Sequence, residues 1–387
     1  LLAGVAWPMS GRCASRQNRG DVVGLKKAPT EASSYPGIAG QAKARTASVV
    51  VGLDNNLFFA TTEGWLVSTR PTGQQRWQKV YGEQFSSTPT LATDGLYVAS
   101  RVALYLVEPG NGNQVSKVSF GPLSSIYDGY LDKPVAGSSP VPDGDKVVYV
   151  GSLDGHVYAV RNDKQVLTTV WKYDLLVPVD TSPALHDGVL YVSTVDGSLH
   201  ALDTQAPDNT TRKKWSVKLA GNDPPPTQLN RALAPTIGAD GTVYAVRAGR
   251  YQVGDASLQA HRPDGTPVWS LSLPGDANAS PVILPDGTLV VATQAAELLY
   301  VSPQGQLLTK VPVGLYASSP PAVDAAGNVF LATASKSGGP DLWAHDGQGK
   351  LLWSLKRGDS EHMALAIDGQ GHVLAVPALE RPEQLAL

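Results

Sequence analysis

Cysteine is almost absent from this chain of 387 residues. A single cysteine, Cys13, excludes a disulfide bond within the chain. Arg12 precedes it, where a lipid-attachment motif needs a small residue, and no histidine lies near it in the sequence to activate a thiol. We therefore expect Cys13 to be a partly buried and inert thiol rather than a lipidated or reactive one.

Long apolar runs and a charge excess are also missing. No run of 18 apolar residues occurs, so the sequence predicts no membrane-spanning helix. The 31 basic and 34 acidic residues give a formal net charge of −3, which provides no basic surface for a nucleic acid. Apolar residues nowhere keep a helical period over a long stretch, and this favours an all-β chain.

The known catalytic and metal-binding motifs do not occur. The seven histidines form no H-x-H or H-x-x-x-H pair, so a zinc site is unsupported. There is no G-x-S-x-G and no P-loop. Most aspartates stand in Asp-Gly turns, and the fragment Asp143-Gly144-Asp145 lacks the glutamate of an EF-hand. We expect no catalytic residue, no metal ion and no cofactor.

Turn residues and an internal repeat are abundant instead. The chain contains 39 glycines and 29 prolines, enough to terminate many short strands. Five of the eight tryptophans recur at one place in the repeat, three of them as G-x-x-x-W: Trp77, Trp171, Trp215, Trp269 and Trp353. Two degenerate units have Ser116 and Thr309 at that place. A period of roughly 40–50 residues indicates a repeat architecture.

Each unit reads as four short strands. A small-small-Pro signal such as Ser138-Ser139-Pro140 is followed by an Asp-Gly turn and an apolar run such as Val147-Val148-Tyr149-Val150. A second turn, a second run and the tryptophan segment complete the unit. Asp-Gly between apolar runs is the strongest short-range hairpin signal, because type I′ turns need positive φ at both central residues.

The number of units determines the predicted fold. Seven units begin near Ser48, Ser87, Ser138, Thr181, Leu233, Ala279 and Ser318. An eighth begins near Met363 and contains two or three strands. Because an open blade would leave a free edge, we expect the N-terminal segment to supply its missing outer strand. The sequence predicts an all-β, eight-bladed β-propeller of four-stranded antiparallel blades, with seven blades as the alternative.

The predicted propeller is one domain, residues 47–387, preceded by an N-terminal segment, residues 1–46. The segment would hold the ring-closing strand. Its first six residues read either as the remnant of a signal peptide or as an early strand.

The repeat resembles that of a known family. The unit small-S-P…DG…VYV…DG…L-x-A…G-x-x-x-W is similar to the PQQ-like propeller repeat of bacterial extracytoplasmic proteins. The opening Trp7-Pro8-Met9-Ser10-Gly11-Arg12 is similar to the W-P-M-x-x-R that starts many such chains. The resemblance covers nearly all of residues 7–376 and implies a periplasmic, outer-membrane-associated or secreted protein. The family includes quinoprotein dehydrogenases, the BamB-type lipoprotein of outer-membrane barrel assembly and sensor domains, and the fold does not choose among them.

The family's enzymes hold PQQ on a tryptophan and beside a vicinal disulfide, with calcium and a catalytic aspartate. One cysteine cannot form that disulfide. The repeated tryptophans are expected to pack against neighbouring blades instead, each burying roughly 150–250 Å². We therefore expect a non-catalytic scaffold or binding protein resembling the BamB group. The alternatives are a PQQ-dependent oxidoreductase and a ligand-binding, glycan-binding or sensor module.

Four insertions interrupt the repeat at residues 121–137, 220–232, 249–256 and 335–340. Two join the fourth strand of a blade to the first strand of the next, and two join second and third strands. Strand directions alternate in an antiparallel blade, so all four connections lie on one face of the disc, the long-loop face. The opposite face, the short-turn face, receives only tight turns in this scheme, including those at Asp94, Asp143, Asp187 and Asp286, and is expected to be inert.

Loops on a rigid scaffold commonly carry binding sites. The insertions contain aromatic and charged residues of the kind enriched at interface hot spots. The candidate partner-binding residues are Tyr127, Asp128, Tyr130, Leu131, Asp223, Arg231, Arg250 and Tyr251. We expect them to contact a protein of the envelope or of an outer-membrane complex, with a small ligand or glycan as the second possibility. The alternative is that the insertions are exposed loops that arose by neutral drift and have no binding function.

Overall fold

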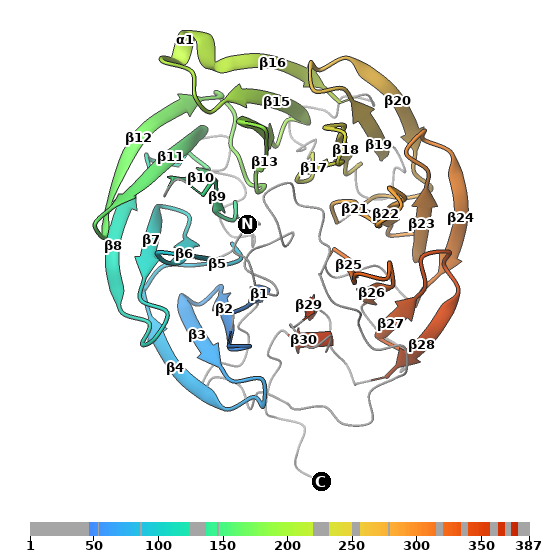
Figure 1. Cartoon of the computed structure of the whole chain (residues 1–387), viewed down its shortest axis with the longest axis horizontal. Helices are drawn as coiled ribbons and strands as arrows, with labels where there is room; N and C mark the ends of the chain where they lie inside the picture. Colours follow the sequence, from blue (N-terminus) through green and yellow to red (C-terminus); the bar gives the residue numbers. More distant parts are fainter. Residues whose placement is uncertain are drawn as a thin grey trace.

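A computed structural model of the chain describes residues 46–52, 54–85, 87–123, 137–144, 147–219, 232–249, 256–277, 279–314, 320–333, 340–356, 363–367 and 373–377. These residues form a ring of antiparallel sheets around a common centre, a β-propeller (Figure 1). Each blade is a meander in which strands that follow one another in sequence are hydrogen-bonded neighbours. The first strand lies toward the centre of the ring and the fourth lies at the rim (Figure 1).

Seven sheets have four strands each. Blades 1 to 3 contain β1 (Thr46–Val51), β2 (Leu57–Thr61), β3 (Trp65–Thr69) and β4 (Gln75–Val80); β5 (Thr90–Ala92), β6 (Gly95–Ala99), β7 (Ala103–Val107) and β8 (Gln114–Ser119); and β9 (Val141–Pro142), β10 (Val147–Gly151), β11 (His156–Asp163) and β12 (Val166–Asp174). Blades 4 and 5 contain β13 (Ala184–His186), β14 (Val189–Ser193), β15 (Ser198–Asp203) and β16 (Lys213–Lys218); and β17 (Thr236–Ile237), β18 (Val243–Arg247), β19 (Ser257–His261) and β20 (Pro267–Ser272). Blades 6 and 7 contain β21 (Val282–Ile283), β22 (Leu289–Ala292), β23 (Glu297–Val301) and β24 (Leu307–Pro312); and β25 (Ala322–Val323), β26 (Val329–Ala332), β27 (Leu342–His345) and β28 (Leu351–Leu355). One short helix, α1 (Asn209–Arg212), interrupts blade 4 between β15 and β16.

The eighth position of the ring differs from the main prediction. It holds a two-stranded sheet of β29 (Met363–Ile367) and β30 (Val373–Pro377), and β29 contacts β1 on one side and β26 on the other. The described residues thus contain the seven four-stranded blades of the alternative prediction, and the expected eighth four-stranded blade is wrong for them. Residues 1–45 lie outside the described residues, so the ring-closing strand stays a prediction.

The hydrophobic core lies between the blades. The second and third strands bury side chains on both faces, because each sheet is covered by a neighbouring sheet on either side. Between blades 1 and 2, for example, Phe58 and Trp77 of one sheet pack with Leu96 and Tyr105 of the next. The turns between these strands use glycines in the left-handed region, such as Gly155 and Gly197 at φ +92° and +82°.

All seven complete blades share a β-bulge between their third and fourth strands. The bulged residue stands immediately before the tryptophan position, so that position has the same partner on the third strand in every blade. The pairs are Trp77 with Ser68, Ser116 with Leu106, Trp171 with Ala159, Trp215 with Ala201, Trp269 with Ala260, Thr309 with Tyr300 and Trp353 with Ala344. A bulge at a fixed place turns the side chains of each outer strand in the same way.

Candidate functional site

The strand ends that flank the four insertions lie on one face. The antiparallel order of every blade places the connections β8–β9, β16–β17, β18–β19 and β26–β27 there. In blade 5 the end of the second insertion bonds to the strand that leads into the third, because Ala232 forms a bridge with Arg247 at the end of β18. At the start of the first insertion, the Gly121 amide donates to Asp154 Oδ2 at 2.8 Å and to Tyr158 Oη at 3.0 Å. The start of the first insertion and the end of the second are thus held by the blades.

Asp154 illustrates how this anchoring works. Its carboxylate is almost completely buried and also accepts the Tyr158 hydroxyl at 2.5 Å and the His156 amide at 3.0 Å. Burial alone would raise the pKa of Asp154, but these hydrogen bonds and those from Ser152 and Gly121 hold its pKa below the ordinary value. The group is therefore a charged structural anchor at neutral pH.

The candidate partner-binding residues themselves lie outside the described residues. This holds for all eight of them: Tyr127, Asp128, Tyr130, Leu131, Asp223, Arg231, Arg250 and Tyr251. Their contact with a partner stays a prediction that rests on the sequence and on the positions of the flanking strands.

The five repeated tryptophans lie at blade boundaries. Trp77 and Trp353 are buried, with 8% and 6% exposure, whereas Trp171, Trp215 and Trp269 are half-buried. Three indole N–H groups donate to a proline carbonyl of the next blade: Trp77 to Pro109 at 3.0 Å, Trp215 to Pro263 at 2.8 Å and Trp269 to Pro303 at 2.8 Å. The indole thus connects neighbouring blades by packing and by a hydrogen bond.

The glycine in the turn between the third and fourth strands has a function at the same boundary, because it accommodates the tryptophan of the preceding blade. A Cβ atom on Gly112 would lie 2.5 Å from Trp77, one on Gly265 would lie 2.7 Å from Trp215, and one on Gly305 would lie 2.5 Å from Trp269. Where Trp is absent, other groups fill the space. The Leu167 amide donates to Ser116 Oγ at 3.0 Å, and Gly349 faces Thr309.

The boundary between blades 3 and 4 is built differently. The tight turn that contains glycine in regular blades is replaced by residues 204–212, which include α1. Asp208 caps this helix by accepting the amides of Thr210 and Thr211. Because the β15–β16 connection belongs to the short-turn face, the prediction that this face carries only tight turns is wrong here. The missing glycine and the Asp-Asn-Thr-Thr capping sequence were the available signals.

Arg212 holds this insertion in place and covers the Trp171 ring, where a glycine lies against the tryptophan at other boundaries. It is only 3% exposed, and its guanidinium lies 4.0 Å above the Trp171 ring. Its nitrogens donate to the carbonyl oxygens of Asp203 at 2.8 Å and Ala206 at 2.9 Å, and to Asn209 Oδ1 at 3.2 Å. Burial lowers the pKa of Arg212, and nearby Asp203 opposes that shift. At this boundary a hydrogen-bonded arginine stacked on Trp171 therefore replaces the contact between an indole and a glycine.

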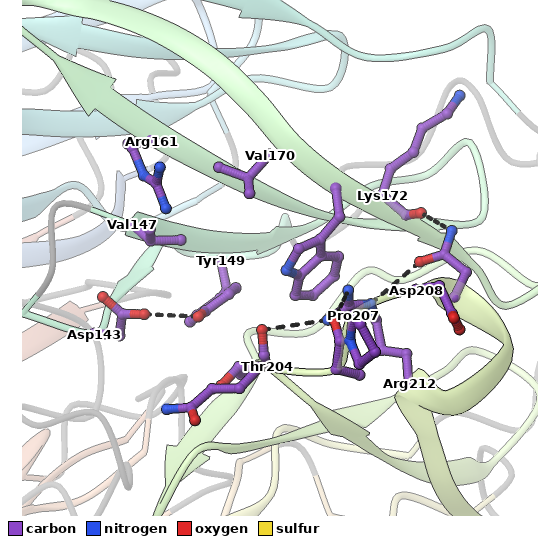
Figure 2. A pocket seen from close by; sticks show the side chains of 14 residues that line it. Asp143, Val147, Tyr149, Arg161, Val170, Lys172, Thr204, Pro207, Asp208 and Arg212 are labelled. Atoms are coloured by element: carbon purple, nitrogen blue, oxygen red, sulfur yellow. Dashed lines mark hydrogen bonds between the residues drawn. The ribbon is translucent and has the colours of Figure 1, made fainter.

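A cleft of about 670 Å³ opens beside Arg212, between the outer strands of blade 3 and the insertion of blade 4 (Figure 2). The side chains that line it include Asp143, Val147, Tyr149, Arg161, Val170, Trp171, Lys172, Thr204, Pro207, Asp208 and Arg212. Tyr149 donates its hydroxyl to Asp143 at 2.7 Å. Burial is the main reason for the raised pKa of Tyr149, and the hydrogen bond to Asp143 adds to it. Tyr149 is therefore a neutral hydrogen-bond donor at physiological pH.

Two further observations concern the described part of the chain. Within it, histidine, cysteine, aspartate and glutamate side chains form no group of three or more that could hold a metal ion. No helix among the same residues has the length and apolar character that crossing a membrane requires.

Comparison with known proteins identifies the family. The family model described as outer membrane protein assembly factor BamB matches residues 100–253 and 254–376, from the middle of blade 2, between β6 and β7, into β30. The chain belongs to this family. BamB of Burkholderia pseudomallei (strain K96243) is 27% identical over 238 residues, which are 60% of this chain and 55% of that protein. The matched region thus spans about half the length of this BamB relative.

Solved structures share the propeller with this BamB-family chain. The crystal structure of BamB from Moraxella catarrhalis has a TM-score of 0.58 at 16% identity, covering 86% of this chain and 95% of that one. The quinohemoprotein alcohol dehydrogenase from Comamonas testosteroni has a TM-score of 0.65 at 12% identity, with 94% and 75% coverage. A europium-containing methanol dehydrogenase has 0.59 at 11%, with 85% and 89% coverage. At these identities the likenesses show the fold alone.

Proposed function

We propose that this protein is a non-catalytic scaffold of the bacterial envelope that takes part in assembling outer-membrane proteins. The observation that carries the proposal is the match of the BamB family model to most of the propeller. The relative from Burkholderia pseudomallei is named as an outer membrane protein assembly factor. We accordingly assign this chain to the periplasmic side of the envelope, in association with an outer-membrane complex.

The partner is expected to bind the long-loop face. The described strands place the ends of four insertions on that face, and the blades beneath it are stiffened by buried anchors such as Asp154. A rigid base with long loops is a common arrangement for protein recognition. Within these loops the proposed contacts are Tyr127, Tyr130, Arg231, Arg250 and Tyr251, since aromatic and arginine side chains dominate interface hot spots.

Site-specific photocrosslinking tests this proposal. A photoreactive amino acid is placed at Tyr127, Tyr130 or Tyr251 in cells, and at Asp94 or Asp187 as matched controls on the short-turn face. We expect the long-loop positions to crosslink to a component of the outer-membrane protein assembly machinery and the control positions to remain uncrosslinked. Crosslinks from the control positions alone would remove the face assignment.

Affinity measurements and a cellular assay complete the test. With the partner purified, Arg250→Ala or Tyr251→Ala should weaken binding by about 1–4 kcal/mol, whereas Asp187→Asn should change little. A strain lacking the protein should have less folded β-barrel protein in its outer membrane, and the parent chain should restore it. Normal levels without the protein would contradict a function in assembly.

The enzyme alternative has its own experiment. Purified protein is titrated with PQQ and calcium while absorbance is followed, and dye-linked oxidation of short alcohols is then measured. We expect no saturable quinone spectrum and no turnover. Stoichiometric quinone binding together with alcohol oxidation would replace the scaffold proposal.

A further inference from the structure

We propose that the cleft between blades 3 and 4, on the short-turn face, is a second binding site that takes an extended acidic peptide segment. The ligand class is a carboxylate-bearing peptide in which acidic and aliphatic side chains alternate. The cleft lies opposite the long-loop face, so this inference does not depend on the proposed function.

The first argument is that the cleft exposes an indole N–H group, which at other blade boundaries donates to a protein carbonyl. The indoles of Trp77, Trp215 and Trp269 each donate to a proline carbonyl of the next blade. The Trp171 indole N–H has no such acceptor among the described residues, because the insertion of blade 4 has replaced the turn that would carry it. An unused N–H on a half-buried ring that lines a cleft is available to a ligand acceptor.

The second argument concerns the charges of the lining. Both carboxylates already accept hydrogen bonds, Asp143 from Tyr149 and Asp208 from the backbone of α1. The Arg161 guanidinium and the Lys172 ammonium group, in contrast, have no hydrogen-bond or ion-pair partner among the described residues. Figure 2 shows Arg161 on one side of the cleft with Tyr149 and Thr204 nearer its middle, while the Lys172 side chain extends away from them on the other side. The groups left for a ligand are therefore mainly donors, with Arg161 as the cation.

The third argument concerns the apolar surface of the cleft. Val147, Val170 and Pro207 line the cleft, and Val170 is 45% exposed although it is aliphatic. A carboxylate next to an aliphatic side chain satisfies both kinds of surface, because an arginine–carboxylate hydrogen bond is charge-assisted and the aliphatic group removes Val170 from water. A volume of about 670 Å³ accommodates a few residues of an extended chain.

The test uses a defined probe and a local signal. The peptide Ac-Glu-Leu-Glu-Leu-Glu-NH₂ is titrated into ¹⁵N-labelled protein, and the Trp171 indole resonance is assigned by its loss in Trp171→Phe. The isosteric peptide with Gln at each Glu position is the ligand control. We expect saturable shifts of the Trp171 resonance with the acidic peptide and an affinity at least about tenfold lower for the Gln peptide.

Matched variants separate binding from stability. Arg161→Gln should weaken the acidic peptide about tenfold, whereas Arg70→Gln, at the equivalent position of blade 1, should have no effect. Trp171→Phe keeps a ring under Arg212 and removes the N–H, so it should weaken binding several-fold without lowering the thermal midpoint. Trp215→Phe breaks the bond to Pro263, so it should lower the thermal midpoint and leave peptide binding unchanged. Tyr251→Ala should leave peptide binding unchanged.

Three results would overturn the proposal. The first is absence of saturable binding up to about 10 mM peptide. The second is equal affinity for the Gln peptide, or equal loss in Arg161→Gln and Arg70→Gln, which would mean nonspecific attraction. The third is a shift of the Trp171 resonance by a neutral oligosaccharide but not by the acidic peptide, which would make the cleft a glycan site.

Discussion

One indole ring and one glycine join each pair of regular neighbouring blades. The ring of Trp269 lies against Gly305, whose φ of +83° and lack of a side chain are both required for the close contact. Gly82 meets only the first requirement: it also has a positive φ, +72°, but no atom lies within 4 Å of its Cβ position. A comparison of Gly305 with Gly82 therefore distinguishes backbone strain from packing.

We expect Gly305→Ala to lower the free energy of unfolding by about 2–4 kcal/mol, which combines left-handed strain with overpacking. Gly82→Ala should lower it by only about 1 kcal/mol. Urea denaturation of both variants measures the difference. Equal losses would show that the glycine is needed for its backbone conformation and not for the tryptophan contact.

Arg212 should be sensitive even to a conservative change. Its planar guanidinium binds three backbone carbonyls and Asn209 while it stacks on Trp171. Lysine keeps the charge but cannot reproduce this fork. We expect Arg212→Lys to lower the free energy of unfolding by about 2–3 kcal/mol, whereas Lys214→Arg on the exposed edge of β16 should be neutral. Thermal and urea denaturation give the comparison, and a neutral Arg212→Lys would contradict this structural function.

His200 gives the protein a predicted sensitivity to mild acid. Burial lowers its pKa from 6.5 to about 4, with Asp196 opposing the shift and Lys213 adding to it. The folded state binds this proton less readily than the unfolded state. The free energy of unfolding therefore has its full value with respect to His200 above pH 6.5, and part of it is lost as the pH falls toward 4. The loss amounts to at most roughly 3 kcal/mol.

Urea denaturation at pH 7 and pH 4.5 tests this dependence. The parent should lose more stability between these values than His200→Gln, whose side chain does not titrate in this range. His261 and His345 have pKa values lowered by burial as well, so the variant should retain part of the dependence. An unchanged dependence in His200→Gln would exclude this histidine as its source.

At the scale of elements, the strands and their turns could be predicted from the sequence, because Asp-Gly pairs and alternating apolar residues are local signals. The structure confirms the four-stranded unit in seven blades. The bulges could not be predicted, since they depend on pairing between two strands. α1 is missed because four residues show no helical period, and the missing glycine and the cap at Asp208 are its signals in the sequence.

The incomplete blade leads to a prediction at the same scale. If residues 1–45 supply a further strand to the sheet of β29 and β30, removing them should speed amide hydrogen exchange in β30. Exchange in the four-stranded blades 3 to 5 should stay close to that of the parent and acts as an internal control. Unchanged exchange in β30 would contradict ring closure by the N-terminal segment.

For the whole molecule, the repeat was sufficient to predict a propeller, since units that follow one another every 40–50 residues and cannot bury both faces alone must cover each other. The exact ring was harder, because the eighth unit ends after β30 among the described residues. The cleft beside Trp171 could also not be predicted from the sequence. It arises from Asp143, Arg161 and Pro207, which lie on three different connections or strands and meet only in the folded ring.

The two boundaries without a tryptophan, at Ser116 and Thr309, lie across the ring from each other (Figure 1). They divide the disc into two arcs, blades 3 to 6 and blades 7, 1 and 2 with the two-stranded sheet between them. In the first arc, indole or arginine contacts join blades 3 to 6, and in the second arc the Trp77 indole joins blades 1 and 2. Bending should therefore be easiest about the diameter that joins the two positions. A disc that flexes about this line would let the loops on one face move toward each other.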